Sequence, residues 1–401
     1  MYIYKPEKCR VPIKVWCEEG TVEQGALDQL ESIAILPFVE GAVCGMPDIH
    51  QGYGMPIGGV AVFKDAVIPS CVGYDVACGM CAIKTSFNAD NLPENFVDVL
   101  EKTIHSIGRA VPMGVGKVHK VPKIDKMPEF DSGTEYINSI WEQAAHQIGT
   151  LGAGNHFIEL QTDENMDLWI MIHSGSRHLG HSICTYHNNI AEEFHKKWSI
   201  SHPDKLAWLP ASSPEGKAYI ADMNICTEYA FNNRQMMMFA VIDQVQRTFE
   251  KYAGVRVSPV DEMINIHHNF ARLESHNGIN GWVHRKGSTS AAKGQLGIIP
   301  GSMGTKSYVV EGLGNEDAYS SCSHGAGRTM SRTQYNKTHT IEQADEEMNG
   351  IVHSKWSKGR KGKIDLSESP SAYKDIDKVM ENQRDLVKIL HTLKPIACAK
   401  G

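Results

Sequence analysis

Short polar segments that follow apolar runs constrain this chain more than any other feature. The sequence holds 19 histidines in 401 residues, and several of them lie in segments crowded with Gly, Ser, Asn and Asp. Such segments form tightly turned, exposed backbone, where sites rather than cores are built. Three of them come at or just after strand-like runs, so the ends of several strands are expected to hold these side chains in a shared pocket.

The spacing of apolar residues predicts a mixture of helices and strands without a regular βαβ order. Helical periodicity is strongest at 23–36, 135–148, 216–253 and 376–393, and Pro395 is expected to end the last of these helices. Strand-like runs occupy 42–46, 57–63, 168–173, 263–267 and 306–310. The sequence therefore predicts a mixed α+β core.

No linker, repeat or low-complexity tract divides the chain, so residues 1–401 are expected to form a single domain. Loop signals predict surface excursions near 107–134, 199–217 and 354–371. The three methionines at 236–238 lie in the longest predicted helix, and we expect them to pack in the core rather than to bind a ligand.

The composition excludes several classes of protein. With 41% hydrophobic and 22% charged residues, the chain is neither disordered, collagen-like nor a coiled coil. Its net charge of −7 means that any polyanion must meet a local basic surface. Two basic runs are candidates for a nucleic-acid footprint: Lys355, Lys358, Arg360, Lys361 and Lys363 around Trp356, and Lys117, His119, Lys120, Lys123 and Lys126.

The apolar runs are far shorter than the ~20 residues that span a bilayer, and residues 1–10 lack the apolar core of a signal peptide. The ten cysteines are spread along the chain, which argues against a disulfide framework. We therefore expect a cytoplasmic protein with no membrane partner.

Asp75 and Cys78 lie three residues apart in a Gly-flanked turn and can converge on one ion. Cys78 and Cys81 also form a lone Cys-x-x-Cys, which leaves three interpretations open. A zinc ribbon would need a second Cys pair, and a thioredoxin-like redox pair would need a βαβ context. A mixed carboxylate–thiolate metal site completed by distant histidines fits the sequence better.

Candidates for those histidines are His156, His173 and His268, each in a segment rich in Gly, Ser or Asn. Taken singly, each of them could equally be a satisfied polar residue. An Asp, Cys and His donor set is compatible with manganese, zinc, cobalt or iron, and its affinity should fall on acidification because protons compete for the ligands.

Two further segments have the donors that bind phosphate. Residues 300–304 form a small-residue turn with free backbone N–H groups, and Ser307 follows it. Residues 321–328 place His324 in a flexible loop, four residues before Arg328. A neutral imidazole can attack phosphorus as a covalent nucleophile, although a His that merely caps its neighbour remains the alternative.

Seven ordered motifs resemble those of the RtcB RNA ligases, which are GTP- and manganese-dependent enzymes that join RNA 3′-phosphate ends to 5′-hydroxyl ends. The resemblance runs from about residue 11 to the closing Lys400-Gly401. The motifs are Met46-Pro47-Asp48-Ile49-His50-Gln51-Gly52, the Asp75/Cys78 turn, Gly154-Asn155-His156-Phe157, His173-Ser174-Gly175-Ser176-Arg177, His267-His268-Asn269, Pro300-Gly301-Ser302-Met303-Gly304 and Ser323-His324-Gly325-Ala326-Gly327-Arg328.

The resemblance implies a fold with a central β-sandwich-like core surrounded by helices, and it implies roles for individual residues. Asp75, Cys78, His156, His173 and His268 would hold two Mn²⁺ ions, with Cys78 bridging. His324 would be the guanylylated catalytic residue, and Arg177 would contact RNA or triphosphate phosphates. The implied GTP contacts are Asn155, His156, Phe157, Ile158, Glu159, His268, Asn269, Pro300, Gly301, Ser302, Met303, Ser307, His324, Gly325, Ala326, Gly327 and Lys400.

The chain departs from the family pattern at His178 and His181, where smaller residues are expected, at the additional thiol of Cys81, and in the basic insert near 354–363. An alternative function is a metal-dependent phosphodiesterase or RNA end-processing hydrolase with the same donors, and a non-enzymatic alternative is an RNA-binding, antitoxin-like module. The sequence identifies neither the physiological RNA, nor an accessory protein, nor the oligomeric state.

Overall fold

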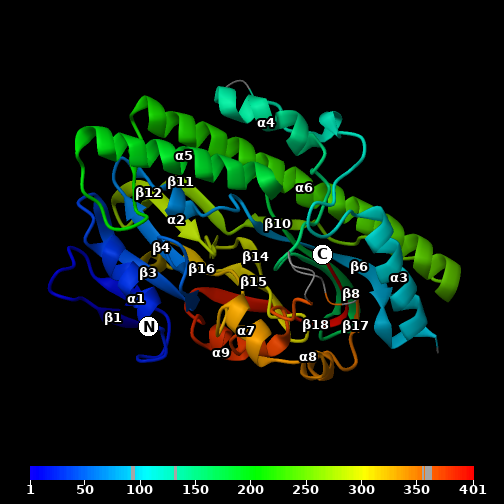
Figure 1. Cartoon of the computed structure of the whole chain (residues 1–401). Coiled ribbons are helices and arrows are strands. Elements are labelled where there is room, and N and C mark those ends of the chain that lie inside the picture. Colours follow the sequence, from blue (N-terminus) through cyan, green and yellow to red (C-terminus); the bar gives the residue numbers. More distant parts are fainter. Residues whose placement is uncertain (92–94, 131–132, 355, 357–363) are drawn as a thin grey trace.

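The computed structural model describes residues 1–401 except 92–94, 131–132, 355 and 357–363 (Figure 1). The helices of the described residues are α1 (Gln24–Ala34), α2 (Pro69–Val72), α3 (Phe96–Ala110), α4 (Glu135–Ala145), α5 (Arg177–Trp198), α6 (Pro214–Ala253), α7 (Arg332–Thr338), α8 (Ile341–Glu347) and α9 (Ile376–Glu381). The strands are β1 (Tyr2–Tyr4), β2 (Ile13–Val15), β3 (Val39–His50), β4 (Ile57–Phe63), β5 (Ala66–Val67), β6 (Gly79–Asn88), β7 (Phe157–Thr162), β8 (Asp167–Ser174), β9 (Leu209–Pro210), β10 (Ile264–His267), β11 (Asn269–His276), β12 (Ile279–Lys286), β13 (Ser288–Ser290), β14 (Leu296–Ile299), β15 (Ser307–Gly312), β16 (Ser321–Ser323), β17 (Val352–His353) and β18 (Val387–Lys400).

Two larger sheets organise the molecule. The six-stranded sheet has the order β1-β2-β3-β4-β12-β11. The eight-stranded sheet has the order β10-β6-β8-β7-β18-β15-β14, with β17 paired to β18. Its terminal strands β10 and β14 lie against each other, so the sheet curls into a nearly closed barrel. The chain passes from one sheet to the other between β10 and β11, at the single residue His268.

The two faces of the eight-stranded sheet have different apolar partners. Strand residues such as Ile158, Ile170 and Ile172 face α3 and α6 in one core. The residues that alternate with them point to the opposite face. Met171, for example, packs inside the curled sheet against Val309 of β15. This alternation follows from the two-residue period of a strand, and it leaves the loop ends of the strands free to carry other chemistry.

The long helices α5 and α6 lie side by side over the strands, while α7, α8 and α9 lie on the opposite side of the sheets (Figure 1). At the start of α6, Ser213 caps the helix by accepting from the Gly216 N–H, and Pro214 takes a first-turn position where no N–H is required. Met237 and Met238 of α6 are fully buried in the core, as predicted.

The α+β class and the helices surrounding a β core are confirmed, as are the five predicted strands and the helices that correspond to α1, α4 and α6. The helix predicted over 376–393 is wrong. Helix α9 ends at Glu381, and the rest of the segment forms β18, which begins at Val387 and pairs with β15 and β7. Pro395 does not end a helix but lies beside a register shift in this strand, where the missing N–H is tolerated.

Among the helices of the described residues, none combines the length and the apolar character needed to cross a lipid bilayer. All ten cysteines are buried and unpaired, in keeping with the prediction that no disulfide framework exists. The predicted basic run Lys355, Lys358, Arg360, Lys361 and Lys363 lies outside the described residues.

Candidate metal centre and nucleotide cavity

Strand register brings the predicted donors to one edge of the eight-stranded sheet. Gly79 of β6 is opposite Ser174 of β8 and opposite His267 of β10, and Phe157 of β7 is opposite His173. Cys78, His156 and His268 each lie one residue beyond one of these paired positions. Donors that are distant in sequence therefore meet because the strands that carry them are neighbours.

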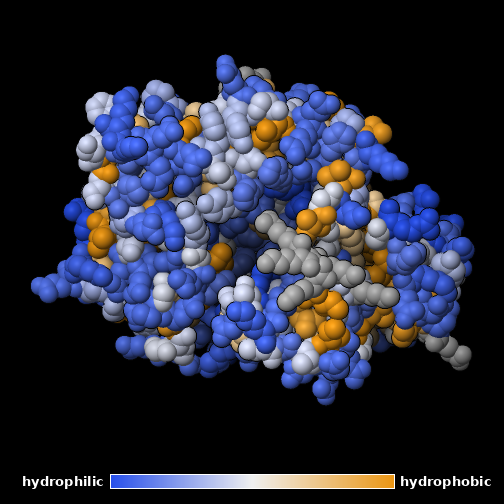
Figure 2. All heavy atoms as spheres, viewed as in Figure 1, coloured by the Kyte–Doolittle hydropathy of each residue, from blue (hydrophilic) through white to orange (hydrophobic). Residues whose placement is uncertain are grey.

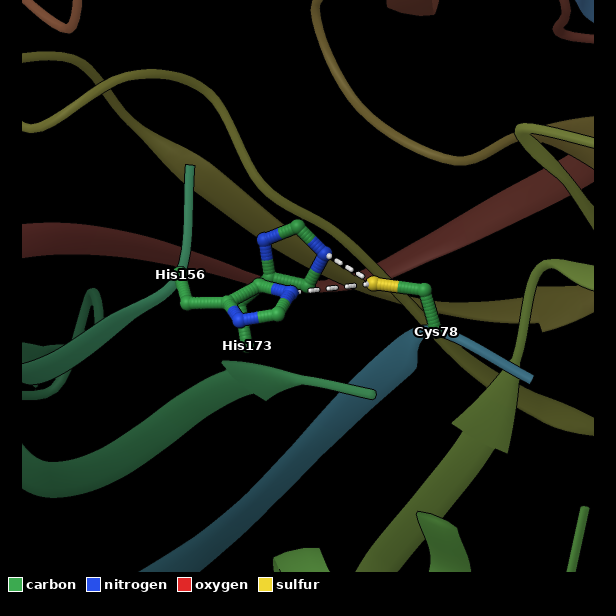
Figure 3. Close-up of side chains that lie close together, drawn as sticks. All are labelled: Cys78, His156 and His173. Carbon is green, nitrogen blue, oxygen red and sulfur yellow. Dashed lines mark hydrogen bonds between the residues drawn. The ribbon is translucent and has the colours of Figure 1, made fainter. Parts of the chain in front are cut away.

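The donor atoms lie within a few ångströms of one another. Cys78 Sγ is 3.4 Å from His156 Nε2 and 3.3 Å from His173 Nε2 (Figure 3). His268 Nε2 is 3.4 Å from His173 Nε2, and Asp75 Oδ2 is 3.1 Å from His156 Nε2. The three residues drawn in Figure 3 form a buried group in which one ligand atom from each lies within 4.8 Å of the others. We call the five residues the donor cluster.

The outer nitrogens of two imidazoles fix their orientation. His156 Nδ1 lies 2.9 Å from the Leu151 carbonyl oxygen, and His173 Nδ1 lies 3.0 Å from the Asn155 carbonyl oxygen. A carbonyl can only accept, so Nδ1 of His173 carries the hydrogen and its Nε2 keeps a lone pair toward the donor cluster, whereas His156 Nδ1 also lies 3.0 Å from the Arg177 guanidinium. A carbonyl bonded to the ring nitrogen that faces away from the metal is typical of metal-binding histidines, so the donor set fits a metal centre.

Burial sets the protonation of the donor cluster. It lowers the pKa of His173 and of His268 well below the usual histidine value, helped by the neighbouring imidazoles. Burial, together with the Asp75 charge, raises the pKa of the Cys78 thiol. Burial would also raise the pKa of Asp75, but the contacts with His156 and Arg177 outweigh it and lower that pKa to about 2. In the absence of a cation, burial thus favours neutral imidazoles at His173 and His268, an ionised carboxylate at Asp75 and a protonated thiol at Cys78.

Two glycines make room for the charged groups around the cluster. A Cβ at Gly175 would lie 2.3 Å from an Asp75 carboxylate oxygen, and one at Gly152 would lie 1.8 Å from the Arg177 guanidinium. Gly152 also has a φ of +86°, which L side chains rarely adopt. A side chain at either position would therefore displace Asp75 or Arg177 from its place beside the donor cluster, and the backbone conformation at Gly152 also favours glycine.

Adjacent residues of α6 support the cluster from behind, and the sequence did not reveal them. Asn233 accepts from the Gly149 N–H and donates to the Gly175 carbonyl. The fully buried Arg234 donates from Nη1 to the carbonyls of Ala77 and Ser174, each at 3.0 Å. A buried guanidinium that joins two ligand-bearing loops keeps their backbones in register, because leaving these carbonyls unpaired would cost free energy.

His324 lies between the donor cluster and the adjoining cavity. Its ring centroid is 4.7 Å from that of His268. On its other side, Asp48 Oδ2 lies 2.5 Å from His324 Nδ1 and accepts from the His324 backbone N–H at 3.0 Å. An ionised carboxylate only accepts, so Nδ1 carries the hydrogen and Nε2 is the nitrogen with a free lone pair.

A cavity of about 250 Å³ adjoins His324 and contains most of the residues implied as nucleotide contacts. Figure 2 shows that this face of the molecule is hollowed between α6 and α7 and that hydrophilic residues line the hollow. The implied contacts that line the cavity are Asn155, Phe157, Pro300, Gly301, Ser302, Met303, His324, Gly325, Ala326, Gly327 and Lys400.

The remaining implied contacts lie elsewhere. Ile158 is fully buried in the core beneath α3 and α6. Glu159 is buried and accepts from Gln161 Nε2 at 2.7 Å, and burial raises its pKa to about 8. His156 and His268 belong to the donor cluster. Asn269 accepts from the Gly287 N–H and donates to the Asp75 carbonyl, so it joins the turn after β12 to the loop that carries Asp75.

The prediction of free backbone N–H groups in the 300–304 turn is wrong for two of them. The Gly301 N–H donates to Ser307 Oγ at 3.3 Å, and the Ser302 N–H donates to Thr305 Oγ1 at 2.7 Å. Hydroxyl groups close to the turn in sequence satisfy these donors locally, which the motif alone could not show.

Cationic side chains supply the charge that those amides do not. Glu368 accepts from Lys400 Nζ at 2.7 Å and pairs with Arg332 at 2.8 Å and with Arg328 at 3.3 Å. Tyr373 donates to the same carboxylate at 2.6 Å. Sequence reasoning missed Arg332, Glu368 and Tyr373 because they lie outside the motifs, whereas Asp48 lay in a recognised motif without an assigned role.

The comparisons with known proteins agree with the geometry. A family model described as "tRNA-splicing ligase RtcB" matches residues 29–139 and 129–401. The chain is 38% identical over 407 residues to the "RNA-splicing ligase RtcB" of Escherichia coli, covering 97% of each chain. It is 32% identical to the protein of that name from Mycobacterium tuberculosis, covering 93% of this chain and 100% of the relative. It is 30% identical to the "tRNA-splicing ligase RtcB" of Archaeoglobus fulgidus, covering 99% of this chain and 96% of the relative.

Proposed function

The chain belongs to the RtcB ligase family, and from this premise we propose that it is an RNA ligase that joins a 3′-phosphate or 2′,3′-cyclic phosphate end to a 5′-hydroxyl end, with GTP as the co-substrate. The proposal assigns residues 1–401 to one catalytic unit. The observation that carries it is the position of His324, whose free nitrogen lies between the donor cluster and the cationic cavity.

The proposal assigns two Mn²⁺ ions to the donor cluster. Asp75 and His156 would hold one ion and His173 and His268 the other, with Cys78 as a further ligand, since its sulfur lies within 3.4 Å of an imidazole of each pair. Bound divalent cations would neutralise phosphate charge and align the departing pyrophosphate. Binding displaces the thiol proton of Cys78, so affinity falls on acidification.

His324 and Asp48 perform the first step in this proposal. The Nε2 lone pair attacks the α-phosphorus of GTP, a P–N bond forms, and the bond to the β-phosphate oxygen breaks as pyrophosphate leaves. The Nδ1 hydrogen stays in its bond to Asp48, which stabilises the positive charge that develops on the ring. Asp48 therefore acts as a positioning residue for the nucleophile.

The later steps transfer GMP to the RNA and then release it. If the RNA ends in a cyclic phosphate, that end is first hydrolysed to a 3′-phosphate. An oxygen of the 3′-phosphate attacks the guanylyl phosphorus, which breaks the P–N bond and restores His324. The 5′-hydroxyl of the second strand then attacks the RNA phosphate, and GMP leaves. Arg328, Arg332 and Lys400 are the cations available in the cavity for the phosphates and the nucleotide.

The family resemblance also underlies the expected setting, which is RNA repair or splicing in the cytoplasm. The ten unpaired thiols support a reducing compartment.

The proposal is tested by incubating the purified protein with Mn²⁺ and GTP labelled at the α-phosphate, followed by RNA strands with 3′-phosphate and 5′-hydroxyl ends. We expect an acid-labile, alkali-stable protein–GMP adduct and a ligated product. Both should disappear in His324→Ala and persist in His339→Ala, where the exchanged imidazole stacks on Tyr335 of α7. Ligation without an adduct would refute the mechanism, and cleavage of RNA ends without ligation would favour the hydrolase alternative.

A further inference from the structure

Four rings form a row on the surface beside the donor cluster. His178 and His181 are three residues apart at the start of α5 and project from one face of the helix. Their ring centroids are 6.0 Å apart, with 18° between the ring planes. The ring of His181 stacks on Tyr74 at 5.1 Å and 29°, and Tyr74 meets Tyr53 at 5.4 Å and 60°. We call these four residues the ring row.

The ring row is joined directly to the site. Tyr74 immediately precedes Asp75, and His178 immediately follows Arg177. Arg177 Nη1 lies 3.0 Å from His156 Nδ1, while its Nε is buried without a hydrogen-bond partner in the described part of the chain. A phosphate held at the donor cluster and at Arg177 would therefore leave the rest of its strand close to the ring row.

Core packing accounts for Tyr74, which packs against the apolar cluster around α5 and α6, but not for the other three rings. His178 and His181 are exposed, Tyr53 is 37% exposed, and Tyr74 is only partly buried. By contrast, the rings of His187 of α5 and Tyr219 of α6, which are 5.1 Å apart, are fully buried. Aromatic and imidazole faces left at the surface beside a phosphate site can stack on nucleobases.

A cation lies at one end of the ring row, and at the other end the segment bonded to His178 is also bonded to a basic run. At one end, Lys205 Nζ lies 5.0 Å from the Tyr53 ring centroid. At the other end, the His178 N–H donates to Gln147 Oε1 at 3.0 Å. The segment that contains Gln147 also contacts the predicted basic run at 117–126, because the Lys123 backbone N–H donates to the Ala145 carbonyl oxygen at 2.7 Å. Lys117, Lys120 and Lys126 of that run are exposed, with Lys126 paired to Asp125 at 3.1 Å, and exposed lysines on a segment bonded to the start of α5 suit a polyanionic strand.

We propose that the ring row binds the unpaired terminal bases of the RNA strand whose 3′-phosphate enters the site. This inference rests on the proposed ligase function and adds a specificity surface to it. Stacking is tolerant of sequence because every base has a π-face, so the ring row selects an unpaired 3′ end rather than a particular sequence. The ring row includes His178 and His181, two of the positions at which the chain departs from the family pattern.

The test measures RNA binding by the full-length protein with Mn²⁺ and without GTP. The probe is a single-stranded RNA with a 3′-phosphate and 2-aminopurine at the penultimate position, whose fluorescence is quenched when the base stacks. We expect the wild type to quench this fluorescence, because the ring row stacks on the labelled base. Stacking contributes about 1–3 kcal/mol per base. We also expect at least a tenfold rise in Kd in the His178→Ala/His181→Ala double variant.

Matched variants separate stacking from other effects. His181→Phe keeps a ring and should bind as the wild type does, whereas His181→Leu should lose affinity. Trp198→Ala is the control, since Trp198 is 61% exposed at the other end of α5 with Lys197 Nζ 5.5 Å from its ring centroid. An unchanged Kd in the double variant, or a loss confined to a 5′-hydroxyl strand, overturns the inference.

Adduct formation with GTP alone distinguishes this inference from the proposed function. A wild type that forms no GMP adduct refutes the ligase mechanism, whereas quenching of the probe does not depend on the adduct. A double variant that forms the adduct at the wild-type rate but binds RNA weakly supports the ring row. A double variant that loses both activities shows a purely structural role and overturns the inference.

Discussion

The two halves of the site are built in different ways. The donor cluster lies at the ends of β6, β7, β8 and β10 of the eight-stranded sheet, and backbone register places its residues. The nucleotide half draws on both larger sheets through side-chain contacts: Asp48 of β3 in the six-stranded sheet holds His324, and Glu368 holds two arginines and Lys400 of β18 in the eight-stranded sheet. A substitution leaves the hydrogen bonds between strand backbones in place, whereas it breaks a network that is made of side-chain contacts. The two halves should therefore respond differently to single substitutions.

The largest effect is expected from Cys78→Ala. Loss of the central thiolate should weaken Mn²⁺ binding by more than about a hundredfold, beyond the usual effect of altering a group behind the ligands. Cys81→Ala is the matched control, because Cys81 is buried in the core beneath α3 and α6 and lies outside the donor cluster. Calorimetric titration with Mn²⁺ measures both variants, and equal losses would contradict the assignment of Cys78 as a ligand.

Glu368→Gln tests whether the nucleotide half depends on its charge network. Removing the carboxylate leaves Lys400, Arg328 and Arg332 near one another without their shared counter-charge, so we expect the free energy of unfolding to fall by about 3 kcal/mol. Urea denaturation measures the loss, with the exposed Glu346→Gln of α8 as the control. Mn²⁺ affinity should not change, and a parallel loss of metal binding would show that the two halves are not independent.

Asp48→Asn tests the positioning of the nucleophile. A hydrogen bond to a charged group contributes about 1.5–3 kcal/mol, so the rate of GMP adduct formation should fall by about thirtyfold. The KM for GTP and the affinity for Mn²⁺ should stay at their wild-type values, because Asp48 contacts His324 rather than the ligands. A general structural role would change all three quantities together.

The smallest effect belongs to a buried histidine outside both halves. His284 of β12 accepts from the Ile68 N–H at 3.1 Å, and burial lowers its pKa to about 4. As pH falls below the ordinary value of 6.5, the unfolded chain takes up a proton before the folded chain does, so stability decreases. Between pH 7.5 and 5.5 this contribution should be about 1.4 kcal/mol.

His284→Gln keeps an acceptor and removes that titration. Urea unfolding at the two pH values should therefore show a loss about 1.4 kcal/mol smaller in the variant than in the wild type. Equal losses in the two proteins would mean that the acid response arises elsewhere, including the site itself.

The local sequence predicted a helix or strand correctly where contacts with the rest of the chain agree with the segment's own conformational preference. The alternating strand at 57–63 and the long amphipathic helix at 216–253 correspond to β4 and α6. Leu386, Leu390 and Leu393 also have helical spacing, but the segment pairs with β7 and β15, and tertiary pairing outweighs this weak local preference. The amphipathic helix α5 was missed because its sequence is rich in histidine and asparagine.

For the site, the motifs identified residue types, and the fold supplied their partners. The motifs singled out Asp75, Cys78, His156, His173 and His268, which the structure brings together. No local pattern could identify Arg234 or Glu368, because their roles depend on carbonyls or cations supplied by distant segments.

The sequence by itself determined which chemical groups this protein possesses and the family to which it belongs, since both depend on short segments and their order. Only the tertiary structure decided which nitrogen of His173 and of His324 is free, which turn amides are already bonded and which cations share a carboxylate. Hydrogen bonds and charge pairs act over a few ångströms, and those distances are set by strand register and helix packing between segments far apart in the chain.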